Sequence, residues 1–161
     1  DNHLESNIAG YNTDGEWGGL HVYDSDVTID GNELVDNSAT WAGSLGTGGG
    51  LYIEGGVVLV QDNAITSNYG GGFPGSPSTA TGFGGGIAIS GSLTIVQDNL
   101  IENNAATKGE GPGVGAGIYG LYGSAHIARN TIAENQGSPV LIGFGGGMYV
   151  QEMAVSLDAK E

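Results

Sequence analysis

Short stretches in which apolar and polar residues alternate recur along the chain and predict β-strands. One copy contains residues 51–53 (Leu-Tyr-Ile), residues 58–60 (Val-Leu-Val) and a third stretch centred on Ile65. Alternation with period two and β-branched residues favours strands over helices, and the Gly and Asn residues between the stretches are typical of tight turns. We therefore expect three short strands in each copy and an all-β chain.

The motif Asn-x-[Leu/Ile]-x-x-Asn marks each copy and gives the repeat its period. Its asparagine pairs are Asn2 and Asn7, Asn32 and Asn37, Asn63 and Asn68, Asn99 and Asn104, and Asn130 and Asn135. Successive motifs start 30, 31, 36 and 31 residues apart. A period of this size indicates a solenoid, in which each repeat stacks on the one before it.

A pair of small residues followed by apolar-x-apolar forms a second motif with the same period. Its first apolar residues are Leu20, Leu51, Ile87, Ile118 and Met148. From each of the first four, the next motif Asn lies 12 residues further on, so length varies only in the connection that precedes the small pair. Three strands in about 31 residues predict a parallel β-helix of about five coils. We expect one domain over residues 1–161, with coil boundaries near residues 24, 55, 91, 122 and 152.

Stacked coils place equivalent residues in columns, and this gives the asparagines a structural role. We expect two ladders in which each side-chain amide donates to the amide oxygen of a neighbouring coil and accepts from the other neighbour. Within such a column the polar groups of every buried asparagine are satisfied. Asparagine also tolerates the left-handed backbone conformation of a sharp bend.

Composition and charge narrow the function classes. Lys and Arg total 3 against 18 Asp and Glu, and the formal net charge of −15 argues against binding to nucleic acid. The chain has no Cys, which excludes disulfides and cysteine metal sites. No apolar run approaches the roughly 18 residues of a membrane-spanning helix.

The two motifs together resemble the right-handed parallel β-helix repeat of bacterial surface proteins and polysaccharide-active enzymes. Residues 34–53 (LVDNSAT…GGGLYI) are similar to the FxxN and GGA[ILV] pairing of polymorphic outer-membrane proteins and autotransporter adhesins, with Leu in place of their Phe. The resemblance implies a right-handed solenoid and an extracellular or cell-surface location in a bacterium.

Aromatic residues on the second motif suggest a binding surface. The outward middle positions of the strands at this motif are His21, Tyr52, Ala88, Tyr119 and Tyr149. Aromatic rings can stack on sugars, and the β-helix lyases that this fold resembles bind polysaccharide along the equivalent face. With two connection residues added, the predicted glycan contacts are His21, Tyr52, Tyr119, Tyr149, Trp17 and Trp41. The alternative is that these rings only pack between neighbouring strands.

The candidate face offers little for catalysis. Its column has no Asp, Glu, Lys or Arg, whereas glycosidases need paired carboxylates and the lyases of this fold are implied to need an acidic metal cluster. We predict a non-catalytic structural or adhesive module without a cofactor. A fragment of a polysaccharide lyase or hydrolase is the alternative.

One acidic column is a candidate for calcium. Asp62 and Asp98 precede motif asparagines and would lie one coil apart, close enough to share Ca²⁺ through oxygen ligands. Arg129 occupies the same position in the next coil, which favours a surface ion pair with Asp98 instead.

The two ends of the sequence fall inside repeats. The chain begins at a third strand, and Lys160 stands where a sixth motif Asn would fall. We expect a solenoid open at both ends, whose partners are flanking coils of a longer chain or other copies stacked end to end. Residues 69–86, the longest connection, are expected to be mobile.

Overall fold

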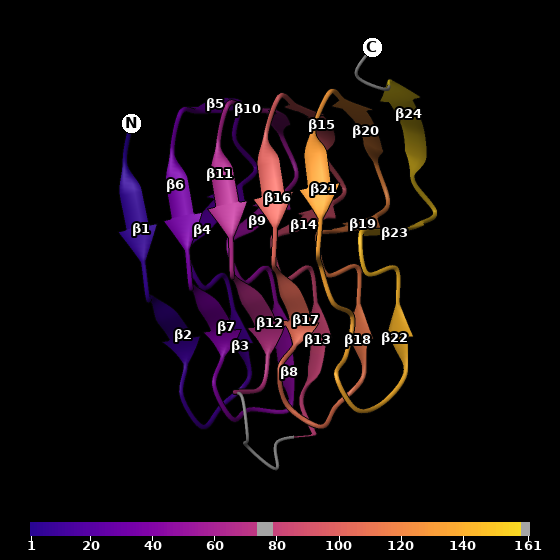
Figure 1. The fold of residues 1–161 in the computed structure, drawn as a ribbon. Coiled ribbons are helices and arrows are strands. Elements are labelled where there is room, and N and C mark those ends of the chain that lie inside the picture. Colours follow the sequence, from indigo (N-terminus) through magenta and orange to yellow (C-terminus); the bar gives the residue numbers. More distant parts are fainter. Residues whose placement is uncertain (74–78, 159–161) are drawn as a thin grey trace.

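The computed structural model describes residues 1–73 and 79–158, which form a parallel β-solenoid (Figure 1). The centre of the long connection, residues 74–78, and Lys160 lie outside the described residues. Equivalent strands of successive coils pair in parallel, which confirms the predicted all-β solenoid of about five coils. Among the described residues there is no helix with the length and hydrophobicity to cross a membrane.

The chain passes through five sheets in each coil, here named A to E in chain order. Sheet A contains β1 (His3–Glu5), β6 (Glu33–Val35), β11 (Ala64–Thr66), β16 (Leu100–Glu102) and β21 (Thr131–Ala133). Sheet B contains β2 (Ile8–Gly10), β7 (Ser38–Thr40), β12 (Tyr69–Gly71) and β17 (Ala105–Thr107). Sheet C contains β3 (Gly15–Glu16), β8 (Leu45–Thr47), β13 (Thr81–Phe83), β18 (Gly113–Val114) and β22 (Gly143–Phe144). Sheet D contains β4 (Leu20–Tyr23), β9 (Leu51–Glu54), β14 (Ile87–Ser90), β19 (Ile118–Leu121) and β23 (Met148–Gln151). Sheet E contains β5 (Val27–Asp30), β10 (Val57–Gln61), β15 (Leu93–Gln97), β20 (Ser124–Ala128) and β24 (Ala154–Asp158).

The number of strands per coil corrects the sequence prediction. The three predicted strands are those of sheets D, E and A. The connection that was expected to be a loop contributes sheets B and C, so a coil has five strands rather than three. In the last coil an isolated bridge from Gln136 to Ala105 replaces the sheet B strand. The residues proposed as coil boundaries lie at the bend between sheets D and E.

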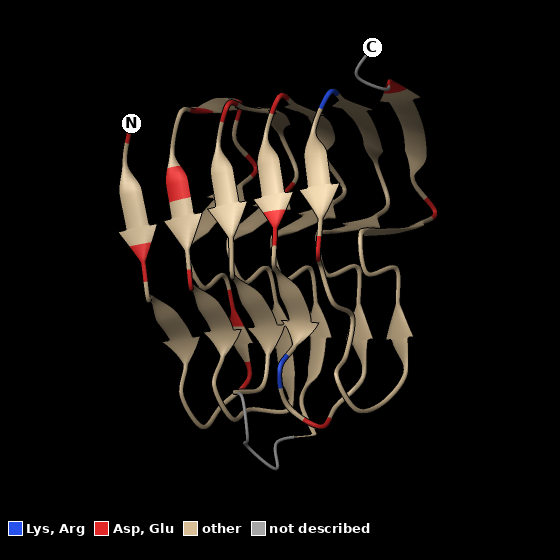
Figure 2. Cartoon of the chain, viewed as in Figure 1, with Lys and Arg blue, Asp and Glu red and all other residues tan. Residues whose placement is uncertain are grey.

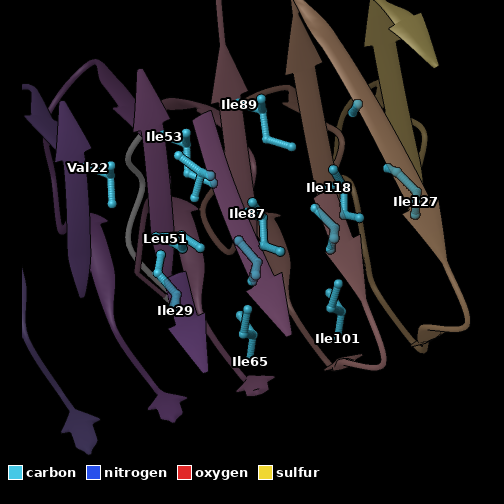
Figure 3. Packing of buried hydrophobic residues seen from close by; sticks show 14 of the residues in the cluster. Val22, Ile29, Leu51, Ile53, Ile65, Ile87, Ile89, Ile101, Ile118 and Ile127 are labelled. Carbon is cyan, nitrogen blue, oxygen red and sulfur yellow. The ribbon is translucent and has the colours of Figure 1, made fainter. Parts of the chain in front are cut away.

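Sheets A, D and E enclose a wide apolar compartment (Figure 3). Ile65 pairs in register with Leu34 on one side and Ile101 on the other, as the predicted column requires. All three side chains are fully buried. Burial of a Leu or Ile side chain contributes about 1.5–3 kcal/mol, so these columns supply most of the driving force for stacking.

Sheets B and C form a second, narrow compartment. Glycine occupies the inward position of sheet C in every coil: Gly15, Gly46, Gly82, Gly113 and Gly143. A Cβ atom on Gly82 would overlap the carbonyl oxygen of Ala106 on the facing strand β17. The two layers therefore approach so closely that only glycine fits between them. This close approach allows the connection between sheets A and D to form the paired strands of sheets B and C.

The asparagines form the two predicted ladders. The backbone N–H and side-chain Nδ2 of Asn63 both donate to Oδ1 of Asn99, each at a distance of 3.0 Å. Nδ2 of Asn63 also donates to the carbonyl oxygen of Ile29 at 2.9 Å. Asn68 is fully buried in the second ladder and is bonded in the same way to Asn104. A ladder thus satisfies polar groups that would each cost about 1–3 kcal/mol if they were buried without a partner.

The second ladder lies against the small-residue pair of the other motif. A Cβ atom on Gly50 would lie 3.0 Å from the side-chain Cγ of Asn68. Gly86 and Gly117 approach Asn104 and Asn135 in the same way. The two sequence motifs therefore meet at the waist between the wide and narrow compartments, and this contact explains why they share one period.

The left-handed backbone positions at the bends differ from the prediction. The residue before each ladder asparagine from Asn7 to Asn135 has a positive φ, while the asparagines themselves do not. Asp62 and Asp98, with φ of 54° and 57°, occupy such positions. Asp is among the few residues that tolerate this conformation, so the acidic column has a structural cause.

The narrow compartment makes a specific prediction for stability. Replacing Gly82 with Ala forces the layers of sheets B and C apart, and we expect the free energy of unfolding to fall by about 3 kcal/mol in urea titrations. Gly147→Ala is the matched control, because a Cβ atom there meets its nearest neighbour, Cγ2 of Ile132, at 3.7 Å. Equal stability of the two variants would contradict the close approach of the layers.

Candidate functional site

The predicted aromatic column is present on the outer face of sheet D. His21 pairs with Tyr52, Tyr52 with Ala88, Ala88 with Tyr119, and Tyr119 with Tyr149. Ala88 is fully buried and interrupts the row of rings. The column therefore consists of two groups of rings rather than one continuous stripe.

The first group, here called the Trp17 stack, contains Trp17, His21, Tyr52 and Tyr23. The rings of Trp17 and His21 are almost parallel, with an interplanar angle of 5° and centroids 3.9 Å apart. Tyr52 stacks on His21 at 5.4 Å and on Trp17 at 6.3 Å, and Tyr23 is tilted against His21 at 6.0 Å. Offset stacking of this kind contributes about 0.5–1.5 kcal/mol for each pair.

The second group, here called the Tyr119 stack, contains Phe83, Tyr119, Tyr149 and Phe144. Tyr119 and Tyr149 are stacked with centroids 6.1 Å apart. Phe83 and Phe144 reach them from sheet C, at 5.0 Å from Tyr119 and 6.5 Å from Tyr149. Rings from sheets C and D thus combine into one surface, which follows from the pairing of the predicted connection into a sheet.

Trp41 lies apart from both groups. It stacks on Phe73 with centroids 3.8 Å apart and on Tyr11 at 5.8 Å, at the bend that joins sheets B and C. The six predicted contact residues therefore do not form a single surface. His21, Tyr52 and Trp17 lie in one stack, Tyr119 and Tyr149 lie in a second, and Trp41 belongs to a third.

Trp17 has an unusual backbone conformation. Its φ is 71°, and the equivalent position in the other coils is glycine: Gly48, Gly84, Gly115 and Gly145, all with positive φ. For a bulky L-residue this region costs about 1–2 kcal/mol. The stack on His21 holds the Trp17 side chain in a place that the repeat otherwise reserves for glycine.

The stack changes the ionisation of His21. Burial lowers its pKa below 6.5, against the opposing effects of Glu54 and Glu16. Its Nε2 atom is buried and has no hydrogen-bond partner within the described residues. Burial, with a smaller effect of Glu54, also raises the pKa of Tyr52 above 10.0. The stack therefore covers His21 and favours its neutral form, while Trp17 and Tyr23 keep exposed ring surface.

Two carboxylates next to the Trp17 stack were missed in the sequence. Glu54 lies two residues after Tyr52 on β9, so the period of two already places both on the same face. Glu16 comes from β3 of sheet C and was hidden because that segment was interpreted as a loop. Asp and Glu are spread over the molecule, whereas Lys and Arg appear at only two places in the described structure (Figure 2).

One member of the predicted calcium pair, Asp98, forms an ion pair with Arg129. Nε of Arg129 donates to Oδ1 of Asp98 at 2.9 Å, and its NH2 group donates to Oδ2 at 2.6 Å. This is the predicted ion pair between adjacent coils. Within residues 1–73 and 79–158 no group of three or more His, Asp or Glu residues is arranged to hold a metal ion. Binding of Ca²⁺ at Asp62 and Asp98 stays a prediction.

Trp17 provides a test of the electrostatics. In Trp17→Gly we expect the pKa of His21 to rise toward 6.5, because the desolvating ring is removed while Glu54 and Glu16 stay. The measurement is an NMR titration of the histidine rings. His3, whose pKa is raised by hydrogen bonds to Glu5 and then Glu33, is the internal control and should not change.

The same shift predicts a pH dependence of stability. The unfolded chain takes up a proton at His21 before the folded chain does, so this residue lowers the free energy of unfolding as the pH falls through 6.5. The loss should be smaller in Trp17→Gly. An unchanged His21 pKa in that variant would show that Trp17 is not the cause of the desolvation.

Comparison with known proteins agrees with this geometry at the level of the fold. The family model described as the right-handed β-helix region matches residues 2–155. No curated protein and no solved structure matches the chain. With a family match over nearly its whole length and a parallel solenoid that carries two asparagine ladders, the chain belongs to the right-handed β-helix family.

Proposed function

We propose that this β-helix is a non-catalytic extracellular module that contacts polysaccharide through the rings of sheets C and D. The observation that carries the proposal is the alignment of the Trp17 and Tyr119 stacks along one face of the solenoid, in register with the coil repeat. A glycan also has a regular repeat, so a row of rings can contact several of its sugars at once. Multiple weak contacts of this kind add up through effective concentration.

Exposure of the rings supports this role. Trp17 is 38% exposed, Tyr23 63% and Phe144 52%, although each packs against another ring. Trp17 occupies a position that is glycine in the other coils. The coils therefore stack without an aromatic residue there, and packing between strands alone does not explain the tryptophan. Each stack thus leaves ring surface to solvent that a sugar can cover.

A glycan array with neutral, amino-substituted and acidic polysaccharides tests the proposal. Replacing both Tyr119 and Tyr149 with Ala should weaken binding about tenfold, while the far-UV circular dichroism of the β-sheets stays unchanged. Tyr11→Ala is the matched control, because Tyr11 belongs to the separate stack with Trp41. Equal loss in the control, or no binding by the wild type, would contradict the proposed face.

A carbohydrate-active enzyme is the second candidate, and of its two forms the position of Glu16 and Glu54 favours a hydrolase over a lyase. Both carboxylates act on His21 from different strands, and paired carboxylates are the catalytic groups of hydrolases. Release of reducing ends from any of these polysaccharides, with loss of turnover in Glu16→Gln and Glu54→Gln, would establish a hydrolase and overturn the non-catalytic proposal.

The last coil supports a second proposal, for a solenoid partner. Strands β22, β23 and β24 are edge strands of sheets C, D and E, and the adjoining residues Val140 and Ile142 are 63% and 64% exposed. Edge strands with exposed apolar neighbours pair readily with further strands. We propose that a further coil of the same kind stacks here, supplied by a longer chain or by another copy.

Sedimentation at several concentrations tests stacking between copies. We expect the isolated chain to form oligomers that dissociate on dilution, and Ile142→Asp to shift the population toward monomer because it places a charge in the interface. Leu93→Asp is the control, because Leu93 is 52% exposed on β15, the central strand of sheet E, away from both open ends. A monomer at all concentrations would contradict stacking between copies.

A further inference from the structure

The Trp17 stack differs from the Tyr119 stack in charge as well as in its strained tryptophan. Glu54 follows Tyr52 on β9, whereas the equivalent residues Leu121 and Gln151 in the Tyr119 stack are uncharged. Glu16 adds a second carboxylate from sheet C, where β13 and β22 present Phe83 and Phe144. One end of the ring face is therefore acidic, and the other is neutral.

None of the ion pairs within the described residues involves these two carboxylates. The ammonium group of Lys108 lies 4.2 Å from the ring centroid of Tyr69, which belongs to sheet B. Arg129 is bound to Asp98 at the bend between sheets E and A. Both carboxylates interact electrostatically with His21, but its lowered pKa keeps it neutral near pH 7.

Neutral rings bordered by uncompensated carboxylates suit an organic cation. A cation above the face of Trp or Tyr is attracted by the ring quadrupole, and Trp is the strongest partner. Glu16 and Glu54 can accept charge-assisted hydrogen bonds from the N–H groups of such a cation. The same carboxylates repel the acid groups of a uronic acid polymer. Strain retained at Trp17 fits a ligand-binding role, because strained residues cluster at functional sites.

We infer that the Trp17 stack binds the ammonium group of an amino sugar, so that the preferred ligand is a polysaccharide of amino sugars with free amines. This inference rests on the proposed glycan contact and specifies its ligand. The sugar ring lies against Trp17 and Tyr52, its ammonium group faces Glu16 and Glu54, and further sugars extend toward the Tyr119 stack.

Calorimetric titration with three probes tests the inference: oligomers of glucosamine, of N-acetylglucosamine and of galacturonic acid, matched in length. The buffer is acidic enough to protonate the glucosamine amines. We expect the glucosamine oligomer to bind most tightly and the galacturonic acid oligomer to bind most weakly. Added salt should weaken the binding of glucosamine and leave that of N-acetylglucosamine almost unchanged, because only the former involves charge.

Variants separate the ammonium site from the rest of the face. The double variant Glu16→Gln, Glu54→Gln should bind the glucosamine oligomer about fivefold more weakly, as expected for the loss of two exposed ion pairs, with no change for N-acetylglucosamine. Tyr119→Ala should weaken both oligomers by the same factor. Circular dichroism establishes that each variant is folded.

The outcomes distinguish the inference from the function on which it rests. If both sugar oligomers bind equally well and the glutamate variants change neither, the ammonium site is wrong while glycan contact stands. Tighter binding of galacturonic acid would also overturn the inference. If none of the oligomers binds, both the inference and the proposed glycan contact fail.

Discussion

Registration of each coil on the next depends on the asparagine ladders. Apolar columns favour stacking but are tolerant of small shifts, because Leu, Ile and Val pack against one another in several arrangements. An amide that donates to a single oxygen in the next coil has no such tolerance: a shift of one residue along the strands would leave its buried donors and acceptors unpaired. Both the column of rings and the column of inward glycines require that register.

The cross-section of the coil follows from residue size. Leu, Ile and Val hold sheets A, D and E apart, whereas glycine and alanine let sheets B and C close on each other. The five additional residues of the longest repeat fall between β12 and β13, yet Gly82 still pairs with Gly46 and Gly113. The longer connection therefore leaves the register of sheet C, on which the ring face depends, unchanged.

Sequence periodicity was sufficient for the solenoid, the apolar columns and both ladders, because each depends on residues at constant spacing. The sequence also contains an equally regular pattern for sheet C. In every coil a glycine lies five residues before the first apolar residue of sheet D, as Gly82 lies before Ile87. Glycine was interpreted as a turn residue, and its role as a spacer appears only when the facing backbone is known. The division of the rings was not predictable in the same way, since it depends on Ala88 and on rings that arrive from another sheet.

The ladders also give the solenoid a direction. In every rung the earlier coil donates and the later coil accepts, from Asn2 to Asn32 and onward to Asn99 and Asn130. One end of each amide column therefore presents oxygen acceptors, and the other presents N–H donors. A further coil can continue the columns only if it keeps this polarity, because two like ends would place acceptor against acceptor or donor against donor. Any array built from this repeat is consequently polar, and its two ends are chemically different.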